Sequence, residues 1–134
     1  MAALLTIKQI FLKDLSFQAP MGAAAFSSAW SPKVKVDVNV ESEPLGDDLY
    51  EVELRLSVAS RTEPNTHYLV EVVQAGVFAL TERDPAAAMR TQRTTCADIL
   101  YPFAREAVEG MVARGRFPAL LLEPLDFAAS YDAP

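Results

Sequence analysis

The sequence contains few residues of the types that carry catalytic or metal-binding chemistry. Its 134 residues include one histidine, His67, and one cysteine, Cys96. A metal site built from such ligands needs about three or four of them close together, so these two residues cannot form one. His67 lies in a polar stretch typical of a turn, and we expect its side chain to be solvated. We therefore predict no metal site and no cofactor.

The other candidates for catalysis lack the partners that the chemistry requires. Asp47-Asp48 lies in a predicted turn, where adjacent side chains diverge and turn formation explains both acids. The hydroxyl pairs Ser27-Ser28 and Thr94-Thr95 have no nearby base to activate a nucleophile. Cys96 lies near the start of a predicted helix, but its surroundings favour a small buried residue over a reactive thiol. The sequence has no glycine-rich phosphate loop, which argues against a nucleotide-driven cycle. Because none of these candidate sites has the residues that catalysis needs, we predict a protein that is not an enzyme.

Composition limits the remaining functions. Hydrophobic residues make up 51% of the chain, yet no apolar run approaches the roughly 18 residues that cross a bilayer. We therefore expect no membrane insertion. The net charge of −6 argues against a nucleic-acid partner. The single cysteine and the lack of a signal-peptide pattern favour the cytoplasm. The excess of apolar residues predicts subunit interfaces or an exposed binding surface.

Hydrophobic patterning predicts the elements that would position such a surface. Residues 1–134 are expected to form a single domain of the α+β class. Residues alternate strictly between apolar and polar along Lys33–Glu41 and again along Leu49–Ala59, which is typical of half-buried strands. The polar connection Arg61–Thr66 predicts an antiparallel hairpin with a further strand, Tyr68–Leu80. The first strand is expected over Leu4–Phe17.

The first and last predicted strands are apolar on both faces. In the first strand, simple alternation places Ile7, Phe11, Leu15 and Phe17 on one face and Ile10 and Leu12 on the other. In the last strand, Gln74-Ala75-Gly76 interrupts the alternation and predicts a bulge. Strands of this kind need cover on both faces.

Two helices are expected in the C-terminal half. Asp84 and Pro85 predict the start of a short helix, Ala86–Arg90. The main helix is expected from Thr95 to Arg114, with Gly115 as its stop signal. It carries two adjacent apolar stripes, and this broad apolar band predicts contact with the sheet and with a second subunit.

Residues 20–30 form a linker of small residues that carries two large aromatic side chains. Small residues allow such a segment to cross a sheet closely, and aromatic rings from several elements could then form an apolar client-binding groove. The residues expected to line that groove are Phe17, Phe26, Trp30, Tyr50, Phe78 and Tyr101. Three alternatives are an ordinary core, a pocket for one small ligand, and a purely structural oligomer.

Five blocks of the sequence resemble the SecB family of protein-export chaperones. They occur in family order and at family spacing, and together they extend over nearly the whole chain. The blocks are Lys13-Asp-Leu-Ser-Phe-Gln-Ala-Pro20, Asp47-Asp-Leu-Tyr-Glu-Val-Glu-Leu-Arg-Leu56, Glu71-Val-Val-Gln-Ala-Gly-Val-Phe78, Ile99-Leu-Tyr-Pro-Phe-Ala-Arg-Glu106 and Met111-Val-Ala-Arg-Gly-Arg-Phe-Pro118.

The resemblance implies a fold, a function and partners. The fold would be a four-stranded antiparallel sheet packed with a long helix, assembled as a dimer of dimers. The function would be that of an ATP-independent holdase, which binds unfolded preproteins and delivers them to the translocase motor SecA. Asp14, Leu69 and Glu71 match family positions that bind SecA. The residues expected at the interfaces of the homotetramer are Ile10, Leu12, Val70, Val72, Gln74, Phe103 and Met111.

Two departures from the family pattern keep an alternative open. Gln18 stands where the family commonly has an acidic residue on the SecA-binding surface, and the sequence ends at Pro134, where typical members continue. A second branch of SecB-like proteins protects the antitoxin of a toxin–antitoxin module. An antitoxin-dedicated chaperone is therefore the alternative function.

Overall fold

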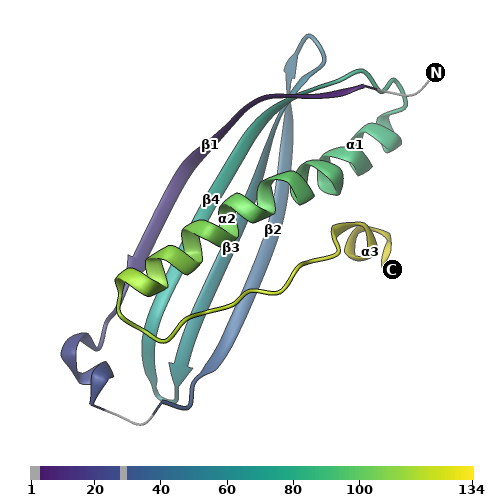
Figure 1. The fold of residues 1–134 in the computed structure, drawn as a ribbon. Helices are drawn as coiled ribbons and strands as arrows, with labels where there is room; N and C mark the ends of the chain where they lie inside the picture. The colour runs from purple at the N-terminus through teal and green to yellow at the C-terminus, as the bar shows by residue number, and fades with distance from the viewer. Residues whose placement is uncertain (1–3, 28–29) are drawn as a thin grey trace.

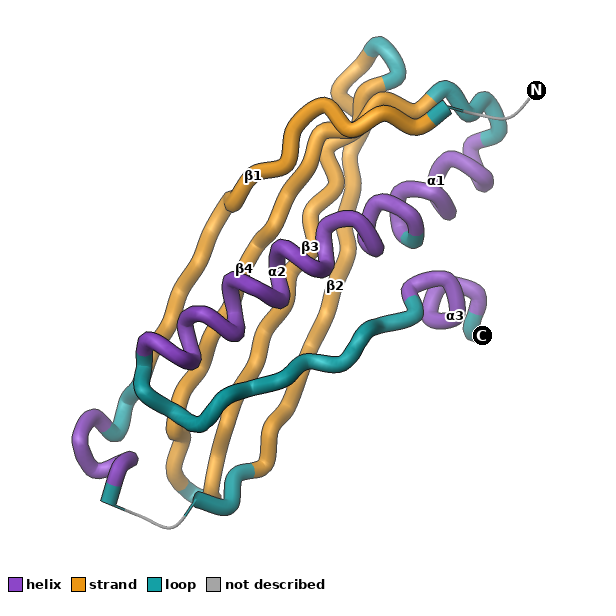
Figure 2. Tube along the Cα trace, viewed as in Figure 1, coloured by secondary structure: helices purple, strands orange, loops and turns teal. Residues whose placement is uncertain are grey.

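The computed structural model describes residues 4–27 and 30–134. Four long strands form one antiparallel sheet in the order β1-β4-β3-β2, and the helices lie over one face of it (Figures 1 and 2). The strands are β1 (Leu5–Gln18), β2 (Lys33–Gly46), β3 (Leu49–Thr62) and β4 (Asn65–Leu80). The helices are the 3-10 turn η1 (Gly22–Phe26), α1 (Pro85–Arg93), α2 (Thr95–Arg114) and α3 (Phe127–Asp132). The predicted α+β fold is confirmed.

Two tight turns build the hairpins that place β3 and β4 in the sheet. Asp47 and Asp48 join β2 to β3 with positive φ angles of 56° and 62°, as the two central residues of a type I′ turn require. Glu63-Pro64 joins β3 to β4. The predicted turn at Asp47-Asp48 and the predicted hairpin at Arg61–Thr66 are both confirmed.

The two faces of the sheet differ in their cover. Val70, Val72 and Phe78 of β4 belong to the core beneath the helices, and we call their side the helix face. Leu69 and Glu71 alternate with them and lie on the other side, which we call the open face. The core on the helix face combines buried strand residues with one stripe of α2: Leu54, Leu56, Val72, Phe78, Leu100, Ala104, Val108 and Val112.

The faces predicted for the first strand are wrong, because β1 contains two bulges. The pairing with β4 shifts between Ile7 and Gln9 and again between Leu12 and Asp14, so β1 has an extra residue at each place. Each extra residue reverses the alternation of the side chains that follow it. Ile10 and Leu12 consequently lie on the helix face, opposite Gly76 and Gln74. Phe11 lies on the open face, opposite Ala75.

The bulge predicted at Gln74-Ala75-Gly76 is also wrong. These residues pair in regular register with both β1 and β3. The glycine serves helix packing instead: a Cβ atom at Gly76 would lie 2.7 Å from the ring of Phe78 and 3.1 Å from the side chain of Leu100 in α2. The irregularity in β4 occurs near its start, where His67 is extra relative to β3.

The bounds predicted for the main helix are those of α2. Its buried stripe contacts β4 and β3, and Cys96 at its first turn is fully buried. Burial raises the pKa of the Cys96 thiol to about 12, so this cysteine is protonated and inert at neutral pH. α1 is longer than predicted, and the side chain of Asp84 caps it by accepting a hydrogen bond from the amide of Ala87. No described helix has both the length and the apolar character needed to cross a membrane.

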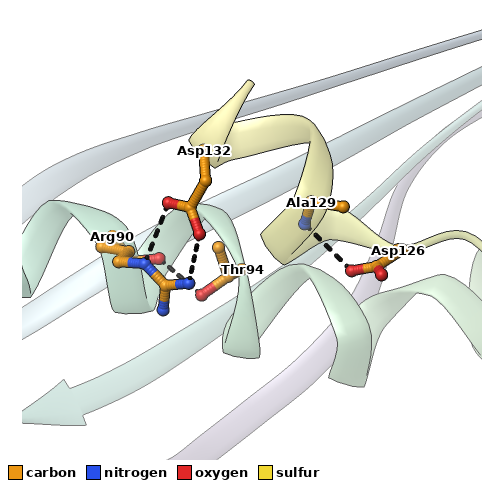
Figure 3. A network of polar contacts seen from close by, with 5 residues as sticks. All are labelled: Arg90, Thr94, Asp126, Ala129 and Asp132. Carbon is orange, nitrogen blue, oxygen red and sulfur yellow. Dashed lines mark hydrogen bonds and ion pairs between the residues drawn. The ribbon is translucent and has the colours of Figure 1, made fainter. Parts of the chain in front are cut away.

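The chain returns along α2 after Gly115 and ends in α3, which the sequence did not predict. The hydroxyl of Tyr101 donates to the carbonyl of Glu123 over 2.6 Å and anchors the returning segment to α2. Asp126 caps α3 by accepting from the amide of Ala129, and Asp132 forms an ion pair of 2.8 Å with Arg90 of α1 (Figure 3).

Candidate functional site

Five aromatic rings meet at one end of the sheet. We call them the aromatic cluster: Phe17 of β1, Phe26 of η1, Trp30, Tyr68 of β4 and Phe117 after α2. Phe117 is the centre, because its ring centroid lies 5.0 Å from that of Tyr68, 5.3 Å from that of Phe26 and 6.0 Å from that of Trp30. Phe17 stacks on Tyr68 at 5.9 Å. The cluster therefore joins residues from both halves of the chain.

The end of α2 makes room for these rings. Gly115 has an ordinary helical φ of −74°, which any residue can adopt, so conformational freedom does not explain why a glycine is needed here. A Cβ atom there would instead lie 2.7 Å from the ring of Phe17 and 3.0 Å from that of Phe117. The left-handed residue that turns the chain is Arg116, with a φ of 65°. Gly115 thus allows β1 and the returning chain to approach the helix end.

The cluster has a buried floor and an exposed upper layer. Tyr68 and Phe117 are 1% and 6% exposed, whereas Trp30 and Phe26 are 40% and 59% exposed. Burial also raises the pKa of the Tyr68 hydroxyl, which keeps it neutral. Exposed rings supported from below by other rings form an apolar surface that can receive another apolar group without rearrangement of the core.

Sequence reasoning found three of the five rings and missed Tyr68 and Phe117. Tyr68 begins a predicted strand, and the local sequence gives no sign that the end of a helix packs near it. Phe117 follows the stop signal of the helix, and its position between Arg116 and Pro118 fits a connecting segment. The available signal is a large aromatic residue two residues after the helix stop.

The other three predicted groove residues lie elsewhere. Tyr50 and Phe78 pair with each other at the opposite end of β3 and β4, and Phe78 is fully buried in the core. Tyr101 is 5% exposed and packs edge-on against Phe127 beneath the returning segment. The expectation of one groove lined by all six aromatic residues is therefore wrong, because the strands separate the two sets along their length.

His67 adjoins the cluster and is buried, contrary to the expectation of a solvated turn residue. Its side chain is 1% exposed, because it belongs to β4 and Trp30 packs edge-on against the imidazole at 4.8 Å. The Nε2 atom lies 2.9 Å from the hydroxyl oxygen of Thr62. Among the described residues, Nδ1 has no hydrogen-bond partner.

Asp14, Leu69 and Glu71 share the open face, away from the helices. Their register places Glu71 opposite Ser16 and Leu69 opposite Gln18. The carboxylate of Glu71 accepts hydrogen bonds from Arg55 over 2.6 Å and from the hydroxyl of Ser57 over 3.0 Å. The structure thus brings the three predicted residues onto one surface, where Glu71 is held by an ion pair.

Farther along the open face, Lys13 lines a shallow pocket together with four glutamates. Glu41 lies opposite Glu53 and Glu43 opposite Glu51 in the pairing of β2 with β3. Lys13, the extra residue of a bulge in β1, reaches across β4 and forms ion pairs with Glu51 and Glu53. These contacts raise the pKa of Lys13, and the hydrogen bond from Lys13 lowers the pKa of Glu53.

The predicted interface residues divide into two groups. Val70 and Val72 are 2% and 0% exposed in the core of the protomer, so their assignment to a subunit interface is not supported. Ile10 is half-buried against the same core. The other four residues line a shallow groove between β1 and α2: Leu12, Gln74, Phe103 and Met111. Leu12 and Phe103 are about half exposed there.

Comparison with known proteins places the whole chain in one family. The family model described as "Preprotein translocase subunit SecB" matches residues 1–134. The Protein-export protein SecB of Pseudomonas syringae pv. tomato is 44% identical over 126 residues, which cover 94% of this chain and 77% of the relative. That of Cellvibrio japonicus is 42% identical over 125 residues, covering 93% and 75%.

A solved structure agrees with the fold. The Mycobacterium tuberculosis Rv1957 SecB-like chaperone, in complex with a ChAD peptide from the Rv1956 HigA1 antitoxin, has a TM-score of 0.68 to this chain at 18% identity. The alignment covers 91% of each chain. At that identity the similarity concerns the fold alone, whereas the sequence matches identify the family. The chain belongs to the SecB family of protein-export chaperones.

Proposed function

We propose that this protein is an ATP-independent holdase, which binds unfolded preproteins in the cytosol through the aromatic cluster. The observation that supports this is the pair of exposed rings, Phe26 and Trp30, lying on buried rings at the end of the sheet. Rings accept apolar side chains in many orientations, so such a surface tolerates many client sequences. Folded proteins bury such segments, and selectivity for unfolded chains then follows from access.

Assembly would strengthen this binding. We propose a homotetramer, a dimer of dimers, in which the exposed apolar side chains of the β1–α2 groove meet those of another protomer. Each side chain that becomes fully buried contributes about 1.5–3 kcal/mol. Several aromatic clusters on one particle can then hold one long client at once, which raises avidity without new contacts.

Client binding is tested with a permanently unfolded chain, reduced and carboxymethylated α-lactalbumin, without nucleotide. Binding should change the fluorescence of Trp30, the only tryptophan, and the native protein should cause no change. Phe26→Ala should weaken binding severalfold, because it removes exposed apolar area. Leu121→Ala is the matched control, since Leu121 is 82% exposed and lies outside the cluster. Saturable binding of one small compound, or equal affinity in both variants, would contradict the proposal.

We propose that SecA, to which clients would be delivered, binds the open face. A basic segment of SecA would bind Asp14 and Glu71 by charge complementarity, with Leu69 adding an apolar contact. Asp14→Lys should abolish SecA binding and leave client affinity unchanged, as measured by calorimetry with each partner. Glu71 is the less informative position, because its replacement also breaks the ion pair with Arg55. Unchanged SecA affinity in Asp14→Lys would show that SecA does not bind this surface.

The antitoxin-dedicated function is not favoured. The antitoxin peptide is known for the Mycobacterium tuberculosis protein, whose similarity to this chain is one of fold. The relatives at 42–44% identity are protein-export proteins.

A further inference from the structure

The imidazole of His67, which adjoins the aromatic cluster, has one nitrogen with no hydrogen-bond partner among the described residues. His67 is 1% exposed, and its Nδ1 atom is buried with no hydrogen-bond partner among the described residues. Buried polar atoms are nearly always paired, since an unpaired one destabilises the fold. An apolar residue of similar size would avoid this cost. A buried, unpaired nitrogen next to a binding surface therefore requires a reason of its own.

The backbone at this position is also irregular. Ser60 pairs with Tyr68 and Arg61 with Thr66, so His67 is the extra residue of a bulge in β4. Bulges redirect a side chain relative to regular alternation, and they are frequent next to functional sites. Here the bulge brings the imidazole against Trp30, with ring centroids 4.8 Å apart and planes at 88°.

The hydrogen bonds of Thr62 indicate which nitrogen carries the proton. The hydroxyl of Thr62 donates to the carbonyl of Ser31 over 3.4 Å. Its single proton is then engaged, so it must accept a hydrogen bond from Nε2 of His67 at 2.9 Å. In a neutral imidazole with the proton on Nε2, Nδ1 has a free lone pair and is an acceptor.

We propose that His67 is the polar recognition residue of the client site, and that its Nδ1 accepts a hydrogen bond from a main-chain N–H of the bound segment. The inference rests on the proposed function. Trp30 is 40% exposed and packs against the imidazole, so rotation of this one side chain on client binding gives access to Nδ1. The main-chain N–H is the donor that nearly every unfolded segment offers, so this bond fixes a client without reading its sequence.

Two substitutions separate this role from a structural one. In His67→Asn the side-chain oxygen can occupy the place of Nδ1, and the contact with Thr62 is lost. In His67→Gln the longer amide can reach Thr62, and no acceptor remains near Nδ1. We expect His67→Gln to weaken binding of reduced, carboxymethylated α-lactalbumin about threefold to tenfold, the usual effect of one neutral hydrogen bond. His67→Asn should stay within about twofold of the unsubstituted protein.

A purely structural histidine gives the opposite order, with His67→Asn the weaker binder. That order, or equal affinity of His67→Gln and the unsubstituted protein, would overturn the inference. If the unsubstituted protein itself failed to bind the unfolded chain, the proposed function would fall instead. Circular dichroism and light scattering establish that each variant keeps the fold and the assembly of the unsubstituted protein.

Backbone-modified peptides provide a second test that does not depend on the folding of variants. An acetylated and amidated peptide of alternating leucine and serine is compared with versions N-methylated at single positions, which each lack one donor. One methylation should weaken binding to the unsubstituted protein about threefold to tenfold and have no further effect on His67→Gln. Equal losses in both proteins would show that the N–H pairs elsewhere, and would overturn the assignment to His67.

Discussion

At the scale of single residues, the two glycines next to aromatic rings have a packing role. Both Gly76 and Gly115 lie where a Cβ atom would come within 2.7 Å of a phenylalanine ring. Neither has a positive φ, so the explanation is close approach and not backbone freedom. Sequence reasoning identified Gly115 as a helix stop, which is correct, and could not find its second role. The rings that exclude a side chain there come from residue 17 and from the chain beyond the helix.

Gly115→Ala should therefore lower the free energy of unfolding by about 1–3 kcal/mol through overpacking against Phe17 and Phe117. Gly110→Ala in the same helix is the control, because a Cβ there has no neighbour within 4 Å. It should raise stability by up to about 1 kcal/mol through helix propensity. Urea unfolding of the two variants measures both effects. An equal change in unfolding free energy in both variants would mean that the rings of the cluster move without cost to accommodate a side chain at residue 115.

At the scale of elements, the features that could be predicted are those that depend on residues close together in the sequence. The bounds of α2, the N-terminal cap of α1 and the turn at Asp47-Asp48 follow from a few adjacent residues, and all three were found. The bulges of β1 were not found, because an extra residue is defined only against the partner strand. β4 is 51 or more residues away in the chain at every pair, and no local signal marks Lys8 or Lys13 as extra.

One of these bulges places Lys13 among four glutamates, and this gives a prediction about pH. The pKa of Glu53 is lowered in the folded state, so its contribution to stability is present above the unfolded pKa of about 4.3 and is lost as pH falls through the lower folded pKa. The pKa of Lys13 is raised, so its contribution is lost only at strongly alkaline pH. Both contributions are present at neutral pH.

Lys13→Met should accordingly destabilise the protein at about pH 7, and the difference from the unsubstituted protein should shrink toward about pH 3. Lys35→Met is the control, since Lys35 is highly exposed and its pair with Asp37 spans 3.8 Å. Urea unfolding midpoints at the two pH values provide the measurement. A difference that did not change with pH would assign the effect of Lys13 to packing.

At the scale of the whole molecule, apolar exposure is distributed unevenly. One stripe of α2 is fully buried by the protomer's own sheet, while Phe103 remains 47% exposed and Leu12 on β1 remains 52% exposed. The sequence correctly indicated surplus apolar surface but assigned Val70 and Val72 to it. Both face the helix once β4 is paired, and only the assembled fold separates core valines from surface ones.

Phe103→Asp with Leu12→Asp should therefore reduce the mass of the particle, because charge within the β1–α2 groove opposes burial against another protomer. Light scattering at micromolar concentration measures the mass. Leu121→Asp, which changes an exposed leucine outside the groove, should leave the mass unchanged. An unsubstituted protein that is monomeric at this concentration would contradict the proposed tetramer.

The sequence distance bridged by the aromatic cluster has a consequence for synthesis. Phe17 belongs to the first strand and Phe117 follows the long helix, yet their rings lie 6.4 Å apart. The central strand β4, which β1 needs as its partner, is also the last strand to be made. Until β4 has been synthesised, β1 has no partner strand, and until Phe117 has been synthesised, Phe26 and Trp30 lack the ring that supports them. The aromatic cluster can thus be completed only after residue 117 has emerged from the ribosome, because Phe117 is its centre.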